Sequence, residues 1–404
     1  MGAGADSWDV CIVGGGVIGC ATARALLARE PALRVCLLEK EAQLALHQSG
    51  RNSGVVHVGY NQKPGTMKAR FVVEGSRRLR EYCSQRGVAV EEGGILVLAR
   101  HTEEESTLEI LRQRGEANGA EVRVIGREEL LQREPDAAGT SALFAPNGAS
   151  FDSRAYVLAL ADDAKSTGAQ IRTGEGVRES RESDDGVRIA TGNSTVSARL
   201  LINCGGLHAD RIAHRMGVGR NVRIVPFLGF YSELRPERRG LVRSHLYPCP
   251  DLEFPFLGVH LSRTFDGRVL VGPGSSVALG REAYRASGLN VRDLLDMALY
   301  RGFRRLIAWP RFRELVRKEW RKSVSRAAVA AEAKQLVPAI RAEDLLRGRA
   351  GIRAQLVDSD GRLVDDLAIE TTARSIHVLN AVSPALTCSM PFADHITDLA
   401  LQKL

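Results

Sequence analysis

The chain has 404 residues, which is more than one compact core usually holds, so we expect two domains. It has 44% hydrophobic and 26% charged residues, as is ordinary for a globular protein, and a formal net charge of +8. Residues 301–326 contain ten Lys or Arg and only two acids, Glu314 and Glu319, so the rest of the chain is nearly neutral. This uneven distribution argues against a broad nucleic-acid-binding surface.

Seven cysteines are scattered along the chain without a CxxC pair. This pattern predicts neither a zinc site nor a disulfide framework, so we expect no metal and a reducing compartment. The start, MGAGADSW, lacks the features of a signal peptide, and we find no run of about 18 apolar residues. We therefore expect a cytoplasmic protein, with peripheral contact at the inner face of a membrane as an alternative.

The first half of the chain alternates strands and helices. Residues 9–13 predict a buried strand that enters a glycine turn, and a helix at 17–29 and a strand at 34–39 follow. Residues 44–65 are rich in Gly, Ser, Asn and His and predict a loop. The next predicted elements are helix 67–86, strand 94–99, helix 102–119, helix 151–167 capped by Asp152 or Ser153, and strands 169–173 and 186–191.

The second half begins with a short apolar strand, RLLIN at 199–203, that runs into Cys204, Gly205 and Gly206. Strand-like runs broken by Pro and Gly fill residues 222–271, and a basic helical segment at 292–326 is interrupted by Pro310. The last 55 residues return to strand, turn, strand and a final helix at 392–403. This alternation predicts an α/β (α+β mixed) fold.

Gly14, Gly16 and Gly19 form a G-x-G-x-x-G fingerprint between the first strand and an alanine-rich helix. The first glycine permits a tight turn, the second a close approach of the backbone to a pyrophosphate, and the third close helix–strand packing. The helix N-terminus then offers N–H groups to phosphates. Glu39 ends the second strand 20 residues after Gly19, where its carboxylate is placed to accept hydrogen bonds from ribose hydroxyls.

Two features favour FAD over NAD as the dinucleotide. A glycine-rich loop, His47 to Gly54, follows the second strand directly, where a nicotinamide-binding domain would usually continue with more βα units. The strand and glycine pair at 200–206 returns far downstream, as if completing the same sheet after an insertion. Such interleaving is typical of flavoproteins that have a separate substrate domain.

Stretches spread from about residue 8 to the C-terminus resemble the D-amino-acid-oxidase-type FAD oxidoreductases, and within them the L-2-hydroxyglutarate dehydrogenases. They are DVCIVGGGVIG, HQSGRNSGVVH, KPGTMKAR, LLINCGGLHAD, PFLGVHLSR, DGRVLVGP, GIRAQLVDSDGRLVDD and HVLNAVSPALT. The resemblance implies a Rossmann-like FAD-binding domain assembled from residues 7–85, 146–220 and 348–404. It also implies a substrate domain, built on a mostly antiparallel sheet plus helices, from residues 86–145 and 221–347.

The fingerprint and the resemblance together predict the residues that contact FAD. They lie in the glycine turn, at the end of the second strand, in the loop after it, in the returning strand and in the last strand-to-helix turn. The predicted contacts are Gly14, Gly16, Val17, Ile18, Gly19, Glu39, Lys40, Ser49, Arg51, Asn52, Ser53, Gly54, Val177, Cys204, Gly205, Gly206, Gly351, Asn380, Ser383, Pro384 and Ala385. Asp210 belongs to the same returning segment.

The resemblance implies oxidation of an L-2-hydroxy acid, namely L-2-hydroxyglutarate to 2-oxoglutarate, a small dicarboxylate pair. Such a reaction needs a base for the hydroxyl proton and cationic or polar groups that hold the carboxylates. His57 is our first candidate for the base, His260 is its rival, and Arg353 is the candidate for a bidentate carboxylate clamp. Other predicted substrate contacts are Arg51, Tyr60, Lys63 and Ser383.

Several alternatives stay open at this point. The chain could instead oxidise an amine, an amino acid or glycerol-3-phosphate, or act as a flavin-binding redox partner without its own substrate. The electron acceptor is a quinone or oxygen. In the basic segment, Phe312, Val316 and Trp320 recur every four positions as one apolar stripe. The segment is either a helical pair packed on the substrate domain with a solvated basic face, or a surface that meets anionic lipid.

Overall fold

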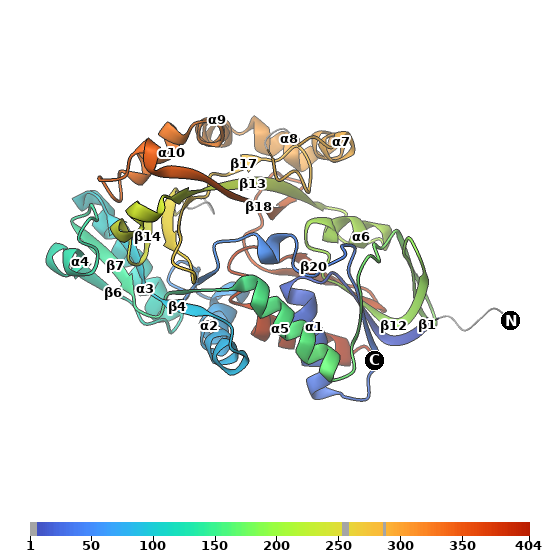
Figure 1. Ribbon diagram of the computed structural model, residues 1–404. Coiled ribbons are helices and arrows are strands. Elements are labelled where there is room, and N and C mark those ends of the chain that lie inside the picture. Colours follow the sequence, from blue (N-terminus) through green and yellow to red (C-terminus); the bar gives the residue numbers. More distant parts are fainter. Residues whose placement is uncertain (1–5, 253–257, 286–287) are drawn as a thin grey trace.

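The computed structural model describes residues 6–252, 258–285 and 288–404. Within these ranges the strands form three sheets, of eight, nine and three strands. Figure 1 shows two main bodies, one around β1 and β12 and the other beneath a layer of helices that contains α7 to α10. The fold is therefore mixed α/β, as the sequence predicts. We call the body around the eight-stranded sheet the first domain and the body around the nine-stranded sheet the second domain.

The first sheet is built around β1 (Asp6–Val13), which carries the glycine turn at its end. It pairs in parallel with β2 (Val35–Leu38) and with β12 (Thr195–Asn203), so the RLLIN strand does complete the fingerprint sheet. The sheet is extended by β9 (Gln170–Arg172), β10 (Glu179–Ser183), β11 (Gly186–Ala190), β19 (Ala368–Thr371) and β20 (Ser375–Asn380).

Helix α1 (Val17–Arg29) is largely buried because it packs against both α5 (Ser153–Ser166) and α11 (Ser389–Leu401). Small residues on its surface permit this close packing on more than one side. Asp152 caps α5 by accepting the N–H groups of Arg154 and Ala155, as expected for an aspartate at this position. Helix α2 (Met67–Arg86) begins after its N-cap residue, Thr66, and contacts α11.

The second sheet is dominated by β13 (Val222–Leu234) and β18 (Leu345–Asp358), which pair antiparallel along nearly their whole length. The domain boundary predicted at residue 348 falls inside β18, so this strand belongs to the second sheet rather than to the first. The sheet also contains β5 (Ile95–Ala99), β6 (Arg123–Gly126), β7 (Ser141–Ala145), β14 (His245–Pro248), β15 (His260–Arg263), β16 (Val269–Gly272) and β17 (Ser276–Val277).

The predicted basic helical segment is a row of short helices over β13 and β18, at the top of Figure 1. Phe312 is fully buried against Phe227 of β13, whereas Trp320 is 62% exposed. The predicted apolar stripe is therefore buried in the core at Phe312 and exposed at the surface at Trp320. The row consists of α7 (Val291–Leu299), α8 (Arg301–Ala308), α9 (Pro310–Val324) and α10 (Arg326–Ala333).

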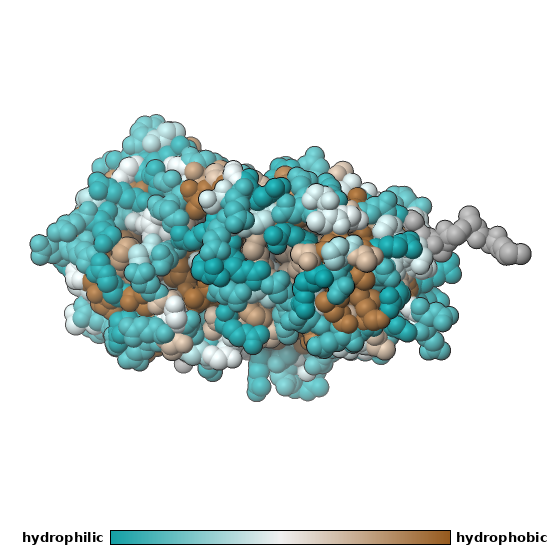
Figure 2. Space-filling model, turned by 90° about the horizontal axis from the view of Figure 1, so that it is seen from below, coloured by the Kyte–Doolittle hydropathy of each residue, from teal (hydrophilic) through white to brown (hydrophobic). Residues whose placement is uncertain are grey.

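The remaining elements connect the two domains or cover their edges. The three-stranded sheet joins β3 (Val55–Val56), β8 (Ala149–Phe151) and β4 (Val90–Glu92). The helices are α3 (Glu105–Ala117), which was predicted, and α4 (Arg127–Arg133) and α6 (Ala209–Arg215), which were not. The first part of the PFLGVHLSR stretch, up to residue 257, lies outside the described residues. Figure 2 shows the molecule from below, where hydrophilic residues predominate between separate hydrophobic areas.

Candidate active site

A cavity of about 1170 Å³ lies between the two domains and is lined by residues of both. It is comparable with the larger ligand sites of proteins, which typically occupy about 300–1,000 Å³. Every residue that the sequence assigns to cofactor, substrate or catalysis lines this cavity, except Gly19, Asp210 and Asn380. The structure thus brings together segments that are hundreds of residues apart in the chain.

The glycine turn accepts no side chain at its critical positions. Gly14 has a φ of 110°, and a Cβ atom there would lie 2.3 Å from the carbonyl oxygen of Cys204. A Cβ atom on Gly19 would lie 2.0 Å from the carbonyl oxygen of Gly14, so Gly19 serves helix–strand packing rather than the cavity wall. Because Gly16 lines the cavity at the N-cap of α1, the helix offers the positive end of its dipole to a bound phosphate.

The Glu39 carboxylate is fixed in place by backbone donors. One of its oxygens accepts the N–H of Gly15 at 2.7 Å, and the other accepts the N–H of Glu41 at 2.9 Å. The side chain is buried but lines the cavity. Its orientation is therefore set before any ligand binds, as expected for a residue that accepts hydrogen bonds from ribose hydroxyls.

The loop after β2 and the returning segment are shaped by their own side chains. The Asn52 amide donates to the carbonyls of Gln48 and Ser49, and its oxygen accepts the N–H of Gly54. Ser49 in turn accepts the N–H of Val17 at 2.9 Å, which ties the loop to α1. The turn, the anchored acid and these loops converge on one elongated cavity, so the residues present fit an FAD molecule.

Two residues that the sequence assigned to FAD contact, Asp210 and Asn380, do not line the cavity. Asp210 is completely buried and forms an ion pair with Arg281, with Nη2 and Oδ2 2.8 Å apart, so it stabilises the fold behind the cavity. Asn380 is also buried, and its amide donates to the carbonyls of Val364 and Asp366. It therefore holds the segment after β18 in place from beneath the cavity wall.

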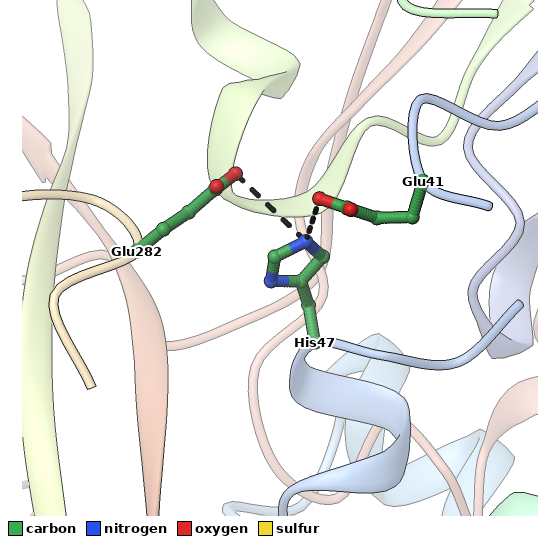
Figure 3. A group of neighbouring side chains, drawn as sticks. All are labelled: Glu41, His47 and Glu282. Carbon is green, nitrogen blue, oxygen red and sulfur yellow. Dashed lines mark hydrogen bonds and ion pairs between the residues drawn. The ribbon is translucent and has the colours of Figure 1, made fainter. Parts of the chain in front are cut away.

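A polar cluster lies at the cavity wall, where the side chains of Glu41, His47 and Glu282 point toward one another (Figure 3). Their ligand atoms are close enough to surround a cation. The Lys40 ammonium lies among them, 2.7 Å from Glu282 and 2.7 Å from the Nε2 atom of His47. The ammonium of Lys40 therefore supplies the positive charge of this cluster. Through Lys40, Glu282 of the second domain contacts the loop of the first domain.

The two candidate bases both lie in the cavity and are both neutral at ordinary pH. Burial lowers the pKa of His57 to about 4 and that of His260 also to about 4. The Nδ1 atom of His260 lies 3.0 Å from the carbonyl oxygen of Gly258 and must carry the proton to donate there, which leaves Nε2 as an acceptor. The ring of His260 stacks on Tyr247 with centroids 4.3 Å apart.

The predicted substrate contacts come from both domains. Arg353 of β18 lines the cavity, and burial lowers its pKa to about 10. Tyr60 is buried, whereas Lys63 is exposed at the cavity wall. Arg51 donates to the carbonyl of Leu46 and lies over the ring of Tyr284, 4.2 Å from its centroid.

Sequence reasoning missed several residues of the cavity wall, notably Lys68, Tyr231 and Tyr247. Lys68 belongs to the quoted KPGTMKAR stretch, but helical periodicity alone does not reveal that its side chain is buried. Tyr231 and Tyr247 lie on β13 and β14, where alternation along the strands was the available signal.

Comparison with known proteins identifies the family. Residues 9–399 match the family described as "FAD dependent oxidoreductase". The chain belongs to this FAD-dependent oxidoreductase family. It is therefore an enzyme of the oxidoreductase class with FAD as its cofactor, as the fingerprint and the loop after β2 predicted.

Relatives and solved structures place the chain within the family. It is 37% identical to the mitochondrial L-2-hydroxyglutarate dehydrogenase of Nematostella vectensis over 98% of this chain and 91% of that protein. It is also 37% identical to the L-2-hydroxyglutarate dehydrogenase of Escherichia coli K12, over 96% of this chain and 92% of that protein. The FAD-bound L-α-glycerophosphate oxidase of Mycoplasma pneumoniae has the same fold, with a TM-score of 0.78, 25% identity, and 99% and 95% coverage of the two chains.

Proposed function

We propose that the protein oxidises L-2-hydroxyglutarate to 2-oxoglutarate. The observation that carries this proposal is one cavity that joins two neutral histidines, His57 and His260, to the cations Arg353 and Lys68 beside the FAD-binding residues. Neutral histidines accept protons and cations hold carboxylates, which is what a hydroxy dicarboxylic acid requires. Relatives named L-2-hydroxyglutarate dehydrogenases, aligned over nearly the whole chain, support the same substrate.

The residues of the cavity then have the following roles. FAD, when bound, supplies the acceptor for the hydride of the hydroxyl-bearing carbon. His57 accepts the hydroxyl proton. Its backbone N–H donates to the hydroxyl oxygen of Thr387, which ties this residue to the loop at 383–387. His260, whose Nε2 atom is also an acceptor, is the rival base for the same proton, and Arg353 holds a carboxylate bidentately.

The test is anaerobic mixing of the FAD-loaded protein with separate 2-hydroxy acids, amino acids and glycerol-3-phosphate while the flavin absorbance is followed. We expect L-2-hydroxyglutarate to bleach the flavin faster than its D-enantiomer and faster than any amine. Bleaching by an amine or by glycerol-3-phosphate, with L-2-hydroxyglutarate inert, would move the protein to another substrate class of its superfamily. If none of these substrates reduces the flavin, the alternative of a flavin-binding redox partner without its own substrate would be favoured.

We further propose that the enzyme is cytoplasmic and contacts the inner face of a membrane through α7, α8 and α9. Of the twelve large hydrophobic residues exposed in the described chain, eight lie between residues 279 and 320. Val291, Leu295 and Leu299 of α7 recur every four positions and are 61%, 54% and 74% exposed. Nine of the ten basic residues at 301–326 are exposed beside them, which suits an anionic lipid surface.

This surface also bears on the electron acceptor. The cavity is lined by Arg305, Leu306 and Trp309, at the junction of α8 and α9 within the same surface. Among the described helices, none is long and apolar enough to cross a membrane, so the contact that we propose is peripheral. We favour a membrane quinone over oxygen as the acceptor because an apolar molecule in the lipid would lie beside this part of the cavity wall.

A further inference from the structure

Lys68 is a buried cation in the wall of the active-site cavity. Its side chain is only 2% exposed, although lysine is rarely buried without a firm partner. The ammonium lies 3.2 Å from Asp365, but the side chain of this aspartate is 64% exposed. The cation is thus shielded from solvent, while its acid is well solvated and compensates the buried charge only in part.

A second cation adds to the positive charge at this place. Burial lowers the pKa of Lys68, and the charge of the nearby Arg353 lowers it further, while the charge of Asp365 raises it. The charge of Asp365 acts on Arg353 as well. The charge of Asp366 also raises the pKa of Lys68, although the Asp366 oxygens already accept the backbone N–H groups of Met67 and Lys68, at 2.9 and 3.0 Å.

Because Asp365 is well solvated and Asp366 already accepts two backbone N–H groups, these two acids compensate the buried charge of Lys68 only in part. Lys68 and Arg353 therefore place two positive charges in a desolvated part of the cavity wall. Two nearby cations repel each other, so this arrangement is unfavourable without a ligand. An anion that binds between the two cations attracts both and makes the arrangement favourable. The anion must reach the cavity, since both Lys68 and Arg353 line it. A carboxylate matches this chemistry, with its planar fork on the guanidinium and its remaining lone pairs toward the ammonium.

We propose that Lys68 and Arg353 jointly bind one carboxylate of the substrate, and that Asp365 weakens this binding by competing for both cations. Lys68 is then a specificity-determining residue, which the sequence analysis did not identify. The identity of the carboxylate as part of L-2-hydroxyglutarate rests on the proposed function, whereas the carboxylate site itself rests only on these three side chains.

The test uses glutarate, a dicarboxylate without a hydroxyl, which binds without turnover. Its dissociation constant is measured on the FAD-loaded protein from the change in flavin absorbance and from the thermal shift, with butyrate as the monocarboxylate comparison. K68M should weaken glutarate binding by about 10–100-fold, the range for a lost charged hydrogen bond, and K68R should restore much of it. K165M, which removes a half-exposed lysine of α5, is the matched control and should bind like the parent.

Asp365→Asn keeps the test decisive even if K68M folds poorly, because it alters an exposed side chain. We expect this variant to bind glutarate several-fold more tightly, the opposite direction to K68M. Unchanged binding in K68M together with weaker binding in Asp365→Asn would overturn the proposal. With L-2-hydroxyglutarate as substrate, K68M should raise KM more than it lowers kcat.

Failure of this proposal and failure of the proposed function give different results. If no 2-hydroxy acid reduces the flavin but K68M still weakens glutarate binding, the carboxylate site stands and the substrate assignment falls. If L-2-hydroxyglutarate reduces the flavin and K68M leaves both KM and glutarate binding unchanged, the function stands and the role of Lys68 falls.

Discussion

Glu39 and Gly15 are joined by a hydrogen bond of 2.7 Å, from the backbone N–H of the glycine turn to the carboxylate at the end of β2. The residue assigned to the ribose therefore also holds the turn assigned to the pyrophosphate. Because the second carboxylate oxygen accepts the N–H of Glu41, both oxygens are already oriented by backbone donors. Two parts of the dinucleotide site are thus positioned by one side chain.

Replacing Glu39 with Gln should weaken FAD binding by about 10–100-fold, because the amide has one acceptor oxygen and leaves one buried N–H group unpaired. The measurement is titration of the apoprotein with FAD, followed by quenching of flavin fluorescence. Glu30→Gln, at the exposed end of α1, is the matched control and should bind FAD normally. An unchanged FAD affinity in Glu39→Gln would remove this residue from the site.

His57→Ala should slow reduction of the flavin by L-2-hydroxyglutarate by about 10²–10⁴-fold if His57 accepts the hydroxyl proton. Single-turnover stopped-flow absorbance isolates this step from reoxidation. His101→Ala, at an exposed position before α3, controls for the loss of a histidine and should react at the parent rate. If His57→Ala reacts normally and His260→Asn is slow, the role of the base belongs to His260.

The pH dependence of flavin reduction follows from the lowered pKa values of the two histidines. The neutral ring is the form that accepts a proton, and both rings become neutral as the pH rises through about 4. The rate should therefore be nearly constant above neutral pH and fall only in strongly acidic buffer. An acidic limb near the ordinary histidine pKa of about 6.5 would show that the base is not one of these buried rings.

Membrane contact should depend on the exposed residues of α7. We expect the protein to sediment with vesicles that contain anionic phosphatidylglycerol at low salt, and to be released by salt because surface charges are screened. Leu295→Asp combined with Leu299→Asp should reduce sedimentation several-fold. Ile110→Asp on α3, which is also an exposed apolar position, is the control. Absence of sedimentation at low salt would refute the membrane proposal.

The features that are local in the sequence were predictable. Gly14 and Gly19 have to be glycines because a Cβ atom would strike backbone within a few residues or across one strand pair. The cap at Asp152 likewise follows from a short motif. The pairing of β12 with β1 is not local, but the apolar run and the glycine pair at 200–206 predicted it. The resemblance added the long-range information that brought His57, His260 and Arg353 to one cavity.

What the sequence did not reveal depends on which neighbour covers each face. The spacing of Phe312, Val316 and Trp320 indicates a common helix face, but only packing on β13 shows that Phe312 is buried and Trp320 is exposed. The resemblance placed a domain boundary at residue 348, yet β18 pairs with β13 on both sides of this position. The burial of Lys68 was hidden for the same reason, since it depends on segments almost 300 residues away.

The buried ion pair of Asp210 and Arg281 makes a strong prediction about stability. Arg281→Met should lower the free energy of unfolding by about 3–5 kcal/mol, because it leaves the Asp210 charge uncompensated in the interior. Arg281→Met combined with Asp210→Asn should be less destabilised than Arg281→Met alone, since the uncompensated charge is gone and an acceptor for the Ile224 N–H remains. Urea unfolding followed by circular dichroism measures these differences. Arg77→Met, in an exposed pair with Glu81, should change stability by at most about 1 kcal/mol. If Arg281→Met is no less stable than the Arg77→Met control, the Asp210–Arg281 ion pair contributes nothing to the stability of the fold.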